Sequence, residues 1–165
     1  GYYSGENITD ITEGRPLFVR KPTSRFSLAN FMRLHLSSAL GALKVGMDIL
    51  IKKEHVAIDK IYGHGGYFTT KGVGQKLLAA AIDTPVSVME TAGEGGPWGM
   101  ALLASYLTWK GEDETLQNYL EGKVFAGNAG TSEESDAKDI EGFEKFIENY
   151  KGAIAVEKTA SEVIK

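Results

Sequence analysis

The chain has 165 residues, and 42% of them are apolar, which is enough for one domain with a buried core. It contains no cysteine, which excludes disulfides, thiolate metal ligands and cysteine nucleophiles and is typical of the reducing cytoplasm. Residues 111–165 carry 6 basic and 13 acidic side chains, and residues 1–110 carry 12 and 9. Neither balance has the strong basic excess of a nucleic-acid-binding domain.

No apolar run reaches the roughly 18 residues that a membrane-spanning helix needs. The most apolar stretch, residues 31–51, is interrupted by Arg33, Lys44 and Asp48. The sequence opens on glycine without a charged-then-apolar leader. We therefore expect a soluble, cytoplasmic protein that has no membrane partner.

Residues 1–26 are rich in Gly, Pro, Thr and charge, which predicts loops and at most an edge strand at residues 17–19. Ser27 is a good helix cap, and apolar residues recur at helical spacing on more than one face from residue 28 to 51. This pattern predicts one long, largely buried helix. After a polar turn, the length and β-branched content of residues 56–62 predict a strand.

The next helix is predicted from a cap at Thr70, most securely over residues 75–82, and it ends before Pro85. Residues 86–89 form a second predicted strand. Pro97 suits a first helical turn and Gly111 a stop, with a helix over residues 100–107 between them. This alternation of helices and strands is typical of an α/β layer structure.

Residues 111–165 no longer show the alternation of helices and strands and are predicted to form a helical appendage. Residues 115–120 predict a short helix, and residues 127–135 predict a loop. A stripe of apolar residues then marks one face of an amphipathic helix: Ile140, Phe143, Phe146, Ile147 and Tyr150.

Two glycine-rich segments each stand between a predicted strand and a predicted helix. The first, "GHGG" at residues 63–66, offers backbone without Cβ atoms where α/β folds bind nucleotides. The second, "GEGGPWG" at residues 93–99, could line the same crevice. Plain turns explain the first equally well, and tight helix packing through Gly99, Ala101 and Ala104 explains the second without a ligand.

Other motifs are absent or incomplete. The first segment lacks the sixth-position glycine of the dinucleotide fingerprint and the Gly-Lys-Ser/Thr of a Walker loop, so a dinucleotide-dependent enzyme is disfavoured. No Gly-x-Ser-x-Gly elbow marks a hydrolase. His35 is expected to be a hydrogen-bonded core or interface residue, and His64 lacks the partners of a metal site.

The order of these segments resembles the carboxy-terminal domain of the FGGY family of carbohydrate kinases. In that family a strand leads into a glycine-rich loop, then a helix, a short "PV" strand, and a Glu-rich turn into a helix rich in small residues. The counterparts here are residues 58–66, 79–81, 84–86 and 94–104, and the match covers residues 28–108 best. The flanking residues 1–27 and 112–165 are similar to the xylulokinase-like branch.

The resemblance implies a partial actin-like, ribonuclease-H-like ATPase domain. Residues 1–27 would be loops and an edge, residues 28–110 the nucleotide-binding core, and residues 111–165 the helical appendage. The loop with Gly65 and Gly66 would border the adenosine and α-phosphate of ATP, although His64 replaces a more usual Gly or Asp. The implied nucleotide contacts are Gly63, Gly65, Gly66, Tyr67, Thr70, Glu94, Gly95 and Gly96.

The resemblance also implies transfer of the γ-phosphoryl group of ATP to a sugar hydroxyl, with a pentulose such as xylulose as substrate. In the family the sugar pocket, the catalytic base and the Mg²⁺ ligands belong mostly to the preceding part of the chain. No catalytic or metal-binding role is therefore assigned to Asp10, Asp48, Asp59 or Asp83. We expect the 165 residues alone to be inactive, and apolar surface without its partner to favour self-association.

A competing hypothesis is a non-catalytic α/β module for interaction or assembly, in which the glycines serve packing only.

Overall fold

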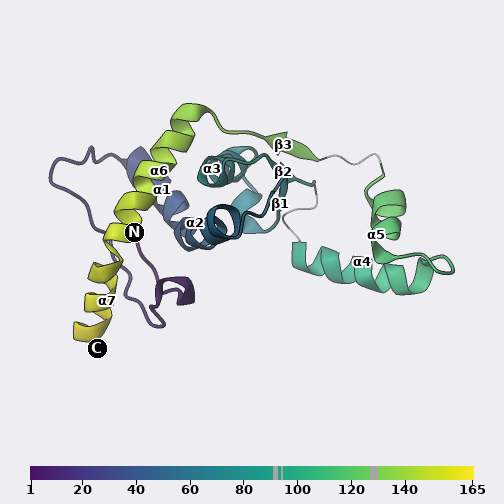
Figure 1. Cartoon of the computed structure of the whole chain (residues 1–165), viewed down its shortest axis with the longest axis horizontal. Coiled ribbons are helices and arrows are strands. Elements are labelled where there is room, and N and C mark those ends of the chain that lie inside the picture. Colours follow the sequence, from purple (N-terminus) through teal and green to yellow (C-terminus); the bar gives the residue numbers. More distant parts are fainter. Residues whose placement is uncertain (91–92, 94, 127–129) are drawn as a thin grey trace. The chain divides into compact units, whose positions relative to one another are not determined.

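The computed structural model describes residues 1–90, 93, 95–126 and 130–165. Figure 1 shows the helices and strands in chain order. Their contacts divide the described residues into two units. Unit 1 comprises Gly1–Ile58, Leu77–Asp83 and Ser135–Lys165, and unit 2 comprises Asp59–Lys76 and Thr84–Glu134.

The predicted long helix over residues 28–51 is divided in the structure. Its start is as predicted, because the Ser27 hydroxyl accepts the Asn30 amide at 3.2 Å and α1 runs over Leu28–Ala39. The amide of Leu40 donates to the carbonyls of Ser37 and Ser38, which ends α1. A second helix, α2, then runs over Gly41–Asp48 and is followed by a π-helical turn, Ile49–Lys53. The prediction of one continuous helix is therefore wrong.

The break coincides with a close approach of backbone to an aromatic ring. A Cβ atom added at Gly41 would lie 2.7 Å from the Tyr150 ring, so only glycine fits there. The expected burial is wrong as well, since Leu28 is 77% and Met32 55% exposed. Among the described residues no single helix could cross a membrane by length and composition, although α1 and Gly41–Lys53 pass together as a pair bent by 43°.

The core of unit 1 is built on α6, Ala137–Gly152, and the predicted amphipathic stripe is confirmed. Phe143, Ile147 and Tyr150 are buried, and each such side chain contributes about 1.5–3 kcal/mol. Tyr2 stacks on Tyr150 with ring centroids 4.9 Å apart, and its hydroxyl donates to the Tyr150 carbonyl at 2.6 Å. Burial raises the pKa of both tyrosines to about 12.

An ion cluster joins α2 to α6 within unit 1. Lys44 is buried and lies 3.1 Å from Asp48 and 2.8 Å from Glu144. Asp48 also meets Lys52 at 3.1 Å and Lys151 at 3.2 Å. Burial alone would raise the pKa of Asp48, but the hydrogen bonds of these lysines hold it below its usual range.

A last helix, α7 over Ile154–Val163, follows α6 and was not predicted as a separate element. It buries Glu157 and Ala160. Near the other end of unit 1, residues 1–17 form a 3-10 turn at Asn7–Thr9 and an antiparallel bridge between Tyr2 and Leu17, in place of a longer edge strand.

Unit 2 contains a three-stranded sheet in the order β1-β2-β3. β1, Ile61–Gly63, pairs in parallel with β2, Val86–Val88, and β2 pairs antiparallel with β3, Thr131–Glu133. Residues 56–60 were predicted as strand and are not: His55 turns the chain at φ +55°, and no strand in the described part of the chain pairs with these residues. The predicted loop over residues 127–135 is also wrong where β3 pairs, and residues 127–129 lie outside the described part.

Two further helices lie between the strands in the sequence, α3 between β1 and β2 and α5 between β2 and β3. α3, Val73–Ile82, confirms the predicted helix, and Leu77 to Ile82 are all buried. Its first amide bonds to the Thr70 carbonyl at 3.2 Å, and Gly72 at φ +77° separates Thr70 from the helix. A short helix α5, Leu116–Tyr119, is capped by the Thr115 hydroxyl and runs into a π-helical turn, Leu120–Val124.

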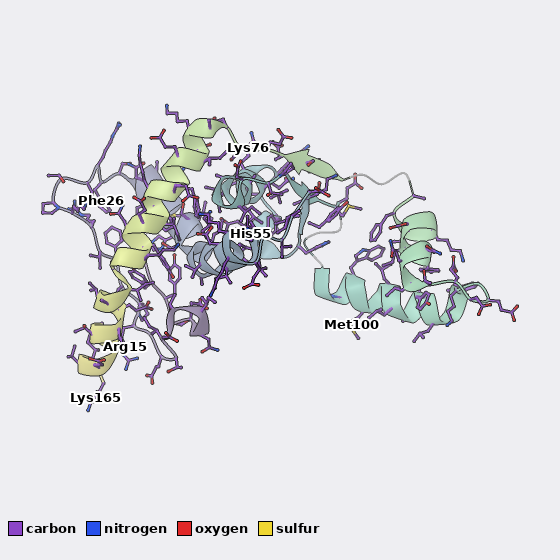
Figure 2. The ribbon with its side chains drawn as sticks, viewed as in Figure 1. Arg15, Phe26, His55, Lys76, Met100 and Lys165 are labelled. Atoms are coloured by element: carbon purple, nitrogen blue, oxygen red, sulfur yellow. The ribbon has the colours of Figure 1, made fainter. Side chains whose placement is uncertain are left out.

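The helix after the second glycine segment, α4, spans Gly95–Trp109 and includes Pro97 in its first turn. Its existence is confirmed, but the expected tight packing is not. A Cβ at Gly99 would meet nothing within 4 Å, and no α4 residue is buried. Met100 is 70% and Leu107 74% exposed. Figure 2 labels Met100 on α4.

Candidate functional site

The two glycine-rich segments leave the same edge of the sheet in unit 2. β1 and β2 are parallel and in register from Ile61 opposite Val86 to Gly63 opposite Val88, so both chains continue from the carboxyl ends of neighbouring strands. That edge is where open α/β sheets bind ligands.

The segments also touch. A Cβ atom added at Gly95 would lie 2.8 Å from the Cβ of His64, and one added at Gly93 would lie 3.8 Å from the Cγ2 of Thr69. The structure thus brings together two motifs that are about 30 residues apart in the sequence.

The glycines of these segments serve different purposes. At Gly63 a Cβ would lie 2.6 Å from the Phe68 ring, so this glycine allows packing. Gly65 has φ +95° and ψ −179°, a conformation that residues with a side chain rarely adopt. At Gly66 and Gly96 an added Cβ would meet nothing within 4 Å, so neither packing nor backbone strain requires glycine there.

A pocket of about 460 Å³ lies at this edge of the sheet. The residues that follow the first segment, through the start of α3, supply one part of its lining, the end of β2 and the residues after it supply another, and the start of β3 supplies the rest. The lining residues are Phe68, Thr69, Lys71, Gln75, Val88, Met89, Glu90, Gly130 and Thr131.

None of the described residues that were predicted for the site is among those that line this pocket. Tyr67 packs edge-on against Phe68 at 5.4 Å and covers Gly74, and Thr70 is exposed in the turn before α3. Gly95 and Gly96 begin α4. Glu94 lies outside the described residues.

The sequence did not predict the residues that line the pocket, and two of them are polar residues near the start of α3. Lys71 is exposed and forms no ion pair within the described part of the chain, so its ammonium group is available to an anion. Gln75 is buried, and its amide donates to the carbonyls of Val86 at 3.2 Å and Thr131 at 2.9 Å. The sequence did contain a signal for Gln75, because it is a polar residue shortly before the all-apolar helical run of residues 77–82.

Gly130 and Thr131 could not have been found from a local pattern, because they sit in a segment predicted to be a loop. Gly130 has φ +62°, and a Cβ there would lie 2.5 Å from the Val88 carbonyl oxygen. This close approach, together with the Gln75 hydrogen bonds, holds β3 against β2 at the pocket.

The arrangement favours an anionic ligand that approaches backbone closely. The Thr69 hydroxyl donates to the Gly66 carbonyl at 2.9 Å and closes the turn that leads past the open face of Gly66. Lys71 brings positive charge to the pocket, and Glu90 brings a carboxylate. In phosphate-binding proteins, backbone without a Cβ atom and a lysine side chain commonly contact phosphate groups.

One of the two histidines outside the glycine segments, His35, has a structural role. His35 lies in α1, where its Nδ1 is 2.9 Å from the Tyr3 hydroxyl and its ring packs against Phe31 at 4.4 Å. The prediction of a hydrogen-bonded histidine is confirmed. Among the described residues no three His, Asp or Glu side chains gather as metal ligands do.

Comparison with known proteins identifies the family. Residues 1–108 match the FGGY family of carbohydrate kinases, C-terminal domain. No curated protein and no solved structure matches the chain. The matched residues contain both glycine segments, β1, β2 and α3, and that domain has an actin-like, ribonuclease-H-like ATPase fold, of which a small mixed sheet flanked by helices forms a part. The chain therefore belongs to the FGGY family of carbohydrate kinases and contains the carboxy-terminal domain of that family.

Proposed function

We propose that the pocket at the carboxyl ends of β1 and β2 binds ATP and that the chain supplies the nucleotide-binding part of a sugar kinase. One observation supports this most directly: the two glycine segments touch, and the nearby pocket is lined by Lys71, which forms no ion pair with any residue that the structure describes. The family match supports the phosphotransfer chemistry.

Each pocket feature would serve a different part of the nucleotide. The backbone at Gly65 and Gly66 would lie along the adenosine and α-phosphate, and the Lys71 ammonium would neutralise phosphate charge. Phosphoryl transfer depends mainly on positioning and charge neutralisation, so these contacts would contribute to the reaction itself as well as to binding. Gly63, Tyr67, Thr70, Glu94, Gly95 and Gly96 remain proposed members of the same site.

Mg²⁺ would enter with ATP and neutralise phosphate charge. In nucleotide sites Mg²⁺ is held by one or two carboxylates together with phosphate oxygens. Among the described lining residues Glu90 supplies one carboxylate, which fits this pattern in part. We propose that the remaining ligands, the sugar pocket and the catalytic base come from the part of the family's chain that precedes this domain.

The experiment is an ATP titration of the isotope-labelled chain, with and without Mg²⁺, followed by amide NMR. We expect shifts centred on residues 63–72, 88–90 and 130–131. Replacing Lys71 by Gln should weaken ATP binding about tenfold, because a charge-assisted hydrogen bond is lost.

Lys76→Gln is the matched control, since Lys76 is a neighbouring exposed lysine that lies 3.7 Å from Glu133 and does not line the pocket. Equal losses in the two variants, or no shifts at millimolar ATP, would contradict an ATP site in this pocket.

The finer proposal is a pentulose kinase of the xylulokinase-like branch, with the 165 residues inactive by themselves. The similarity of the flanking segments to that branch supports it. Turnover that depends on both ATP and sugar in the purified chain would overturn the second half of this proposal, and activity of the complete kinase on other sugars but not pentuloses would overturn the first.

A second candidate function is an assembly module, and the surface of α4 favours it. Met100, Leu103 and Leu107 are each more than 45% exposed, which is a long apolar face to leave in water. Sedimentation velocity over a range of concentrations tests self-association: a constant sedimentation coefficient would contradict it.

A further inference from the structure

Unit 1 contains a cavity that the proposed kinase chemistry does not use. It has a volume of about 590 Å³. One side is formed by residues 18–31, the segment that leads into α1, where Figure 2 labels Phe26. The other side is formed by Phe146, Asn149 and Tyr150 of α6.

Three phenylalanine rings cluster at this cavity. Phe18, Phe26 and Phe31 contact one another with centroids 5.3–6.0 Å apart, in tilted or edge-to-face geometry. Phe18 is 41% and Phe26 58% exposed. Their rings therefore offer apolar faces to a flat group, and aromatic groups favour such contacts.

Three cations stand at the same cavity. Arg20, Lys21 and Arg25 are exposed, and no carboxylate is among the residues that line it. None of the three forms an ion pair within the part of the chain that the structure describes. Arg20 lies over the Phe26 ring at 5.0 Å from its centroid, so positive charge and aromatic surface are side by side.

We propose that this cavity binds a small anion that carries a flat aromatic ring. The ring would lie against the phenylalanine cluster, and the anionic group would meet Arg20, Lys21 and Arg25. The volume is within the range of small-molecule pockets, and the concave shape suits such a ligand better than the broad face of another protein. The amino-terminal end of α1, capped by Ser27, adds partial positive charge nearby.

The test uses phenyl phosphate as the probe and compares it with its two halves, phenol and inorganic phosphate. Amide NMR of the labelled chain should show saturable shifts over residues 18–31 with phenyl phosphate. We expect its dissociation constant to be at least about tenfold lower than that of either half, because ring and charge contribute together. If phenol bound as tightly as phenyl phosphate, the cavity would be an apolar surface without an anion site, and the proposal would be overturned. The absence of saturable shifts would overturn it as well.

Variants separate the two contributions. Arg25→Gln and Arg20→Gln should each weaken phenyl phosphate binding about three- to fivefold, as expected for partly exposed charges. Phe26→Ala should weaken it by a similar factor. These residues are exposed, so the amide spectrum of each variant should otherwise remain that of the parent, which confirms folding.

The matched control is Lys110→Gln. Lys110 also lies over an aromatic ring, that of Tyr106 at 5.2 Å, but in unit 2 and without a phenylalanine cluster. Its binding of phenyl phosphate should equal that of the parent, and a comparable loss there would overturn the proposal. The two proposals are distinguished by where the shifts fall: on residues 18–31 for this cavity, and on residues 63–72, 88–90 and 130–131 for the ATP site.

Discussion

Adding one methyl group at each of two adjacent glycines tests the nucleotide proposal. At Gly66 the added Cβ of Gly66→Ala would meet nothing within 4 Å, and the backbone has no left-handed conformation to lose. Replacing glycine by alanine at a compatible position stabilises a protein by about 0.4–1 kcal/mol through the unfolded chain. We expect Gly66→Ala to fold at least as stably as the parent.

The neighbouring substitution should behave in the opposite way. Gly65 has φ +95° and ψ −179°, and holding a residue with a side chain in such a region costs about 1–3 kcal/mol. Gly65→Ala should therefore lower the free energy of unfolding by that amount.

ATP binding should respond at both positions, for different reasons. At Gly66 the methyl group would stand between the backbone and the phosphate, and we expect a loss of about tenfold or more, which is about 1.4 kcal/mol. At Gly65 the strained turn would be displaced. Urea unfolding measures stability and isothermal titration calorimetry measures ATP affinity. Parental ATP affinity in Gly66→Ala would refute the close approach of phosphate, and parental stability in Gly65→Ala would refute the backbone argument.

Two further predictions concern buried charges in unit 1. Asp48→Asn removes a partner of the buried Lys44 and should lower the free energy of unfolding by about 2 kcal/mol at pH 7. Because the pKa of Asp48 is lowered in the folded protein, this loss of stability should shrink as the pH falls below about 4. Urea unfolding at each pH measures it. Burial raises the pKa of Glu157, so its ionisation costs stability as the pH rises through the folded pKa. Glu157→Gln should accordingly be more stable than the parent at neutral pH and lose this advantage near pH 4; a pH-independent difference would contradict that origin.

Local signals were sufficient for several elements. The side chain of Ser27 caps α1 as predicted, and α5 lies within the predicted helix over residues 115–120, with Thr115 as its cap. The stripe on α6 has helical spacing, and Phe143, Ile147 and Tyr150 of it are buried. The amphipathic period and the caps act over a few residues, so the sequence alone reveals them.

Errors arose where distant segments meet. The predicted helix is divided next to Gly41, whose backbone lies against the ring of Tyr150, more than 100 residues later. β3 exists because its backbone pairs with β2, and nothing in the composition of residues 131–133 distinguishes it from a loop. Residues 56–60 have strand-like side chains, but no strand among the residues that the structure describes pairs with them.

At the candidate site, too, some features follow from the sequence and others only from the tertiary structure. The sequence by itself determined the two glycine segments, their places after β1 and β2, and the resemblance to the FGGY carbohydrate kinases that the family match then confirmed. Only the tertiary structure decided which glycines allow packing, which one needs a positive φ and which face open space, and only it placed Lys71, Gln75 and Thr131 at one pocket. The physical reason is that a strand, a contact or a pocket requires partners from separate parts of the chain, whereas a helix cap or an amphipathic face requires only its neighbours.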